Sequence, residues 1–155
     1  MAGSNKIRNI KQAEKPIGKK IQQEENPDKI YDYSPAWCFA GADQEKWPFS
    51  EEQIGEKFWS EIYPRLRNLE SQKWKEILVK NKKYNHEINV EKLNKVAQDR
   101  LAERHIEAEA LISLRVTGSH RLYGYLTGYA FNILWFDDDH GDNQRCVCRS
   151  KKKHT

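Results

Sequence analysis

Alternation of apolar and polar residues dominates the sequence from residue 111 to residue 136. The runs 111–117, 121–126 and 130–136 repeat with the period of two that strands show. Gly118-Ser119 and Thr127-Gly128 separate these runs and are typical of hairpin turns. The pattern therefore predicts an antiparallel β-meander of three strands.

The alternation also predicts the two faces of this meander. Ile112, Leu114 and Val116 share one face, whereas Arg115 lies on the other. The second predicted strand places its own charged and aromatic residues on that other face, namely Arg121, Tyr123 and Tyr125. We expect the apolar face to pack on helices and the Arg/Tyr face to be open.

Helical periodicity precedes the meander. Ser50 and Gln53 have the spacing of a capping box, and apolar residues then recur every three to four positions, at Ile54, Phe58, Ile62, Leu66 and Leu69. Pro64 is expected to kink or divide this helix. Residues 80–87 read as a loop, and residues 90–105 as a second amphipathic helix.

The N-terminal part differs in character. Residues 1–30 are rich in Lys, Gln, Glu and Asn and contain few large apolar side chains, so we expect a flexible basic arm. Aromatic residues begin at Tyr31 and continue to Phe49, which predicts a loop-rich strap held by its rings. Residues 31–155 are then a single α+β domain.

Composition narrows the class of protein. The 155 residues include 27 basic and 23 acidic ones, and a net charge of +4 is too small to steer the whole molecule onto nucleic acid. No apolar stretch reaches the roughly 20 residues of a membrane span, and the polar start has no signal-peptide core. Cys38, Cys146 and Cys148 are too few for a disulfide framework. We expect a cytoplasmic protein with thiols and no membrane association.

One motif carries a resemblance to a known family. The pattern Leu-Arg-x-x-Gly-x-x-Arg-Leu at residues 114–122, followed by Phe-x-Ile-Leu at residues 131–134 and preceded by two helices, resembles the RelE/ParE/YoeB toxin superfamily. The segment 135–140 and the terminal Lys-Lys-His-Thr are also similar to bacterial proteins of unassigned activity. The first resemblance implies two helices on one side of an antiparallel sheet, with RNA held on the opposite, concave face.

The resemblance also implies roles for individual residues. Arg121 matches an arginine that stabilises charge on the scissile phosphate, and Arg115 matches a second arginine of the sheet. A guanidinium suits phosphate because it binds bidentately and stays charged. His140 or His154 would transfer the proton, since an imidazole titrates near pH 6.5. Alternatively, Arg121 pairs with a carboxylate or covers the sheet, and His140 is an exposed loop residue.

RNA contacts are expected from rings and from the basic tail. Tyr123 and Tyr125 follow Arg121 on its face and are candidates for base stacking. The tail would have to fold back across the sheet to supply its phosphate-binding candidates, which are Arg149, Lys151, Lys152 and Lys153. The five tryptophans are better explained as core and strap anchors.

Acidic residues argue against parts of this reading. Asp137, Asp138 and Asp139 occupy positions at which the RNA-cleaving toxins carry basic residues, and their charge would repel RNA. Consecutive acids do not converge on a Mg²⁺ ion, and the spacing of Cys146 and Cys148 is too short for a typical zinc site. We therefore expect no metal and no cofactor.

Together these features favour a protein acting on RNA, as a metal-independent endoribonuclease that works either with or without the ribosome. Its expected partners are RNA or the ribosome and a neutralising antitoxin protein. The alternative is a non-catalytic module that binds RNA, a ribosome or a protein through the same fold.

Overall fold

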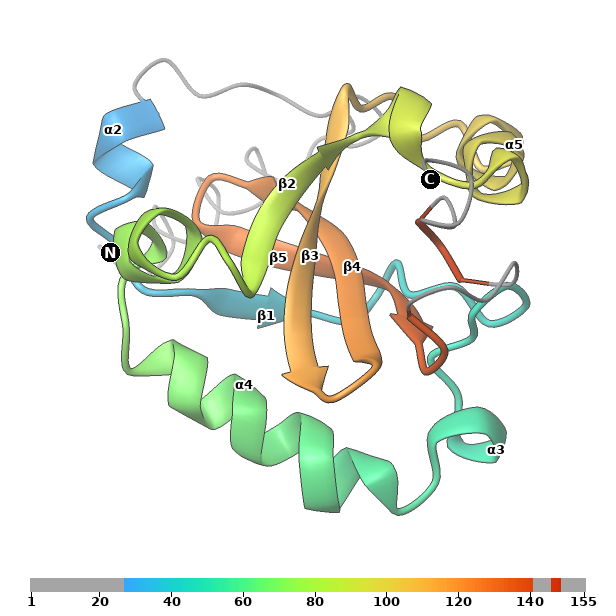
Figure 1. The fold of residues 1–155 in the computed structure, drawn as a ribbon, viewed down its shortest axis with the longest axis horizontal. Helices are drawn as coiled ribbons and strands as arrows, with labels where there is room; N and C mark the ends of the chain where they lie inside the picture. The colour runs from blue at the N-terminus through green and yellow to red at the C-terminus, as the bar shows by residue number, and fades with distance from the viewer. Residues whose placement is uncertain (1–26, 141–145, 149–155) are drawn as a thin grey trace, which may run out of the picture.

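The computed structural model describes residues 27–140 and 146–148 of the chain. Five strands form one mixed sheet in the order β1-β5-β4-β3-β2 (Figure 1). The strands are β1 (Ala36–Cys38), β2 (Asn85–Asn89), β3 (Ala110–Thr117), β4 (His120–Thr127) and β5 (Ala130–Asp137). Strand β1 pairs parallel to β5, and all other neighbours are antiparallel.

The predicted meander is confirmed, and β2 extends it by one strand. β3, β4 and β5 begin and end within one residue of the predicted runs. The segment 80–87 is not the loop that we expected, because it contains the end of a helical turn at Glu76–Lys80 and the start of β2. The sequence of β2 has a single large apolar residue, Ile88, and therefore no alternating pattern that predicts a strand. Pairing with β3 stabilises β2 instead.

The helices are α2 (Pro27–Ile30), α3 (Glu51–Ile54), α4 (Tyr63–Glu70) and α5 (Lys95–Glu103). Ser50 caps α3 as predicted, since its Oγ accepts a hydrogen bond from Gln53 N at 3.2 Å. A π-helical segment, Phe58–Ile62, leads into α4, and Pro64 lies in the first turn of α4. The second predicted helix starts later than residue 90, because Asn94 caps α5 through its side chain.

The two main helices, α4 and α5, pack on opposite faces of the sheet. One core joins α4 residues such as Leu66 to the even-numbered positions of β3, including Leu114. The other core joins Leu101 of α5 to Leu111 and Tyr123, which point the opposite way. Figure 1 shows α4 below the strands and α5 to their right. The prediction that the Arg/Tyr face is open is therefore wrong. Helix α5 covers this face together with two loop segments, which contribute Trp47 and Val147.

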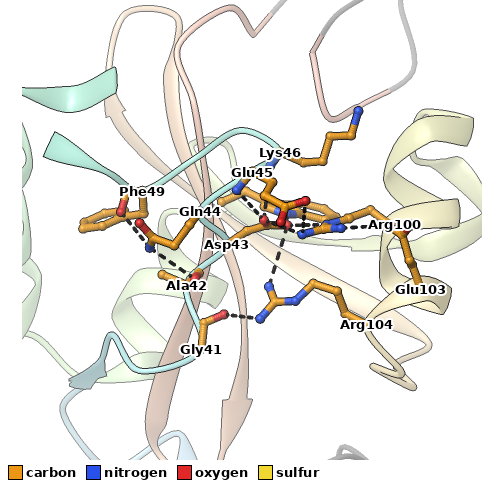
Figure 2. Close-up of polar contacts among 11 residues, drawn as sticks. Gly41, Ala42, Asp43, Gln44, Glu45, Lys46, Phe49, Arg100, Glu103 and Arg104 are labelled. Atoms are coloured by element: carbon orange, nitrogen blue, oxygen red, sulfur yellow. Dashed lines mark hydrogen bonds and ion pairs between the residues drawn. The ribbon is translucent and has the colours of Figure 1, made fainter. Parts of the chain in front are cut away.

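A buried ion pair closes this second face. Asp43, only 1% exposed, accepts hydrogen bonds from Arg100 Nε and Nη2 at 2.8 and 2.9 Å and from Trp135 Nε1 at 2.9 Å (Figure 2). Burial raises the pKa of Asp43, but these bonds outweigh it and hold the pKa well below its usual range. The cluster ties the strap to α5 and β5.

A β-bulge in β5 lets two neighbouring residues enter this second core. The β4–β5 register shifts between Tyr123 and Gly124, where Leu134 is the extra residue of β5. As a result, Leu134 and Trp135 both contribute to the core beneath α5, although they are neighbours in sequence.

Within the described residues, no helix has the length and apolar character needed to cross a membrane.

Candidate functional site

Two arginines face each other where β3 and β4 meet their connecting turn. Arg115 and Arg121 are direct register partners across the two strands. Like charges placed directly opposite each other destabilise a sheet. Neither arginine forms an ion pair with a carboxylate in ranges 27–140 and 146–148. The pair is thus a concentration of positive charge that an anion would relieve.

The Asp137 carboxylate is the one best placed to neutralise Arg121, but it binds backbone amides instead. Asp137 is the register partner of Arg121 on β5, but it is 1% exposed and its two oxygens accept backbone hydrogen bonds. Val147 N donates at 2.7 Å and Asp139 N at 2.9 Å. Burial raises the pKa of Asp137 to about 6, against the effect of these two bonds.

Arg121 is anchored to the turn rather than to an acid. Its Nη1 donates to Gly118 O at 2.6 Å and to His120 O at 3.0 Å. Burial, and next the nearby charge of Arg115, lower the pKa of Arg121. An arginine still remains protonated at neutral pH, so the guanidinium is a fixed charge at the end of the sheet.

A third arginine, which the sequence did not single out, joins the pair. Arg65 of α4 donates from Nε to Arg115 O at 2.7 Å and from Nη2 to Asn85 Oδ1 at 3.4 Å. The Arg115 guanidinium carbon lies 5.0 Å from the centre of the Tyr84 ring. A shallow hollow of about 390 Å³ is lined by Arg65, Tyr84, Arg115 and Val116. Its cationic and aromatic lining suits a phosphate with an attached base or sugar.

His140 lies beside the same turn. Its backbone N donates to Ser119 O at 2.9 Å, next to the carbonyl that Arg121 binds. Its Nδ1 lies 3.5 Å from the Tyr123 hydroxyl and 3.5 Å from Cys148 Sγ. The structure therefore brings His140 and Arg121 together at one hairpin.

The two tyrosines are placed differently from what we expected. Tyr123 is fully buried, and burial and then the nearby Cys148 raise its pKa well above the usual value. A ring with no exposed face does not stack on a base in this conformation. Tyr125 is half-buried in the same core, and burial raises its pKa too. Both rings support the core beneath α5.

The acidic run is less repulsive than the sequence suggested. Asp137 is buried, while Asp138 accepts from Gln53 Nε2 at 3.0 Å and lies 3.9 Å from Lys57 Nζ. In the described part of the chain, no group of three His, Cys, Asp or Glu residues is arranged to hold a metal ion. The remaining predicted site residues lie outside the described residues; they are His154, Arg149, Lys151, Lys152 and Lys153.

Tryptophans divide between core and surface. Trp74 and Trp135 are fully buried, and Trp37 and Trp47 pack against the two cores, as predicted for anchors. Trp59 is 68% exposed, so the prediction that all five tryptophans are core and strap anchors is wrong for this residue.

Comparisons of the chain with protein-family models, curated proteins and solved structures found no match.

Proposed function

We propose that this protein acts on RNA through the Arg115–Arg121 pair, on a RelE-like fold, as a metal-independent endoribonuclease. The observation that carries the proposal is the directly paired arginines without an ion-paired carboxylate in the described residues. A phosphate bound between them would convert a repulsive pair into two charge-assisted contacts.

The covered second face limits where RNA would bind. Because α5 and the strap occupy that face, the concave surface of the related toxins is not open in this chain. The β3–β4 turn and the hollow beside Arg65 and Tyr84 remain open at the end of the sheet. We therefore place the RNA backbone at this end rather than across the sheet.

The chemistry would be intramolecular attack by a ribose 2′-hydroxyl on the adjacent phosphate. Arg121, with Arg115, stabilises the negative charge that develops on the phosphoryl oxygens. His140 transfers the proton at its imidazole, and His154 is the alternative proton carrier from the tail. A toxin of this kind would also be held in check by a neutralising protein partner.

A specific observation favours a second candidate, a non-catalytic RNA-binding module. His140 Nδ1 already faces Tyr123 and Cys148, and Arg121 Nη1 already donates to two carbonyls. In that case the arginines bind phosphate, but no group moves a proton.

A cell-free translation reaction distinguishes the two candidates. Purified protein is added, and messenger 5′ ends are mapped by primer extension with and without ribosomes. The endoribonuclease predicts new ends that His140→Ala and Arg121→Ala abolish, whereas Arg67→Ala, an exposed arginine of α4, keeps them. Intact messenger together with salt-dependent RNA binding supports the module. Intact messenger without any RNA binding contradicts the proposal.

A further inference from the structure

Two cysteines face each other at the edge of the site. The segment 146–148 returns to the sheet beside the end of β5, and Cys146 Sγ lies 3.2 Å from Cys148 Sγ. Cys146 is fully buried, whereas Cys148 is partly exposed. A disulfide bond of about 2.05 Å would require the two sulfur atoms to approach each other by a little more than about 1 Å.

The backbone around these cysteines is held on both sides. Val147 N donates to Asp137 Oδ2 at 2.7 Å, and Asn94 N donates to Val147 O at 2.8 Å. The Asn94 side chain also donates to Cys146 O at 3.3 Å. Val147 itself is fully buried in the core beneath α5. The two thiols are therefore fixed relative to each other rather than brought together by chance.

A base lies next to the more exposed thiol. His140 Nδ1 is 3.5 Å from Cys148 Sγ, so a neutral imidazole can accept the thiol proton. The thiolate is the form that reacts with peroxides. Cys146 Sγ donates to Cys148 O at 2.9 Å, and a hydrogen bond donated by a thiol favours its protonated form.

We propose that Cys146 and Cys148 form a redox-active dithiol that hydrogen peroxide oxidises to an intramolecular disulfide. The Cys148 thiolate attacks one peroxide oxygen, so that an S–O bond forms, the O–O bond breaks and the leaving hydroxide takes a proton to become water. The Cys146 sulfur then attacks the Cys148 sulfenic acid, and the S–O bond breaks as the S–S bond forms. A second water leaves with the Cys146 proton, and a dithiol reductant reverses the change.

The residues have distinct roles in this scheme. Cys148 reacts first because it is accessible and has the imidazole; Cys146 resolves the intermediate because it is buried at contact distance. Cys38, the third cysteine, lies on β1, and its rate of oxidation is the reference against which the pair is compared. The scheme involves the two thiols and His140, and it holds whether or not the protein acts on RNA.

The test uses the reduced full-length chain and hydrogen peroxide. After a timed exposure, remaining thiols are alkylated and the protein is cleaved with trypsin. Cleavage after Arg145 and Arg149 releases both cysteines in one tetrapeptide, residues 146–149, while Cys38 leaves in peptide 30–46. We expect the tetrapeptide to lose the mass of two hydrogens and escape alkylation, with Cys38 still alkylated.

Variants separate the steps of the scheme. Cys146→Ser should stop at a Cys148 sulfenic acid, which a 1,3-diketone probe captures, and Cys148→Ser should leave Cys146 alkylated. His140→Gln should slow oxidation of Cys148 by about tenfold. Two results with the unmodified protein would overturn the proposal by themselves. One is oxidation of Cys38 at the same rate as the pair, and the other is the formation of intermolecular disulfides only.

Discussion

Arg115 of β3 and Arg121 of β4 face each other as a directly paired couple, and Arg115 also lowers the pKa of Arg65 and of Arg121, after the larger effect of burial. Such a pairing raises the free energy of the folded state by about 0.2–1 kcal/mol unless an anion lies between the charges. The site therefore predicts specific stabilisation by oxyanions.

Phosphate is expected to raise the melting temperature more than chloride does at equal ionic strength. Part of that rise is general, because phosphate is excluded from protein surfaces. Arg115→Gln should lose at least half of the phosphate-specific rise, whereas Arg67→Gln, with the same loss of charge, should keep it. Thermal denaturation followed by circular dichroism measures the three proteins. An equal phosphate effect in all three would rule out an anion site at the pair.

Asp43 carries much of the stability of the second face. Its carboxylate is fully enclosed by the Arg100 guanidinium, the Trp135 indole and two backbone amides. Asp43→Asn removes the buried carboxylate that pairs with Arg100 and leaves it only the exposed carboxylates of Glu45 and Glu103. The substitution should cost about 3–5 kcal/mol of unfolding free energy. Asp99→Asn removes an exposed ion pair with Lys95 and should cost about 0.5 kcal/mol at most. Urea denaturation compares them, and equal losses would contradict this role.

Asp137 should make stability fall as pH rises from about 4 to 6. Its pKa is raised to about 6, so the folded chain binds more protons than the unfolded chain in this interval. Relative to Asp137→Asn, the unmodified protein should lose up to about 3 kcal/mol across it. The variant's lost hydrogen bond shifts its whole curve but not the slope. Urea denaturation at several pH values tests this, and parallel curves would show that Asp137 titrates normally.

Gly124 is required by close packing of β4 against β5. A Cβ at this position would lie 2.1 Å from Asn132 O and 2.7 Å from a ring carbon of Phe131. Gly124→Ala should therefore destabilise the fold by about 1–3 kcal/mol or more. Gly41→Ala meets no atom within 4 Å and should be close to neutral. The midpoint of urea unfolding distinguishes the two, and a neutral Gly124→Ala would show that β5 adjusts.

The sequence predicted the part of the fold that local patterns encode. Residues 110–137 form three β-rich runs with glycines at their turns, so the three-stranded meander was predictable. β1 was not, because a strand of three residues, Ala36–Cys38, exists through pairing with distant β5. The side of the sheet that α5 covers was missed as well. It depends on Asp43 and Arg100, which meet only in the folded chain.

The candidate site shows the same division. Arg121, Arg115 and His140 were predicted from motif positions, and the structure gathers them around one turn. Arg65 was not predicted, because an arginine on an amphipathic helix looks like a solvated residue until α4 is placed against β3. The contact between the Cys146 and Cys148 sulfur atoms was not predicted either.

The most direct test of the central claim is binding of a fluorescently labelled single-stranded RNA, measured by anisotropy between 50 and 200 mM KCl. The unmodified protein should bind with a salt-dependent affinity. Arg121→Ala should bind about tenfold more weakly, with a smaller salt slope, while Arg67→Ala should stay within about twofold. Equal weakening by both substitutions, or no binding by the unmodified protein at 50 mM KCl, would contradict the account.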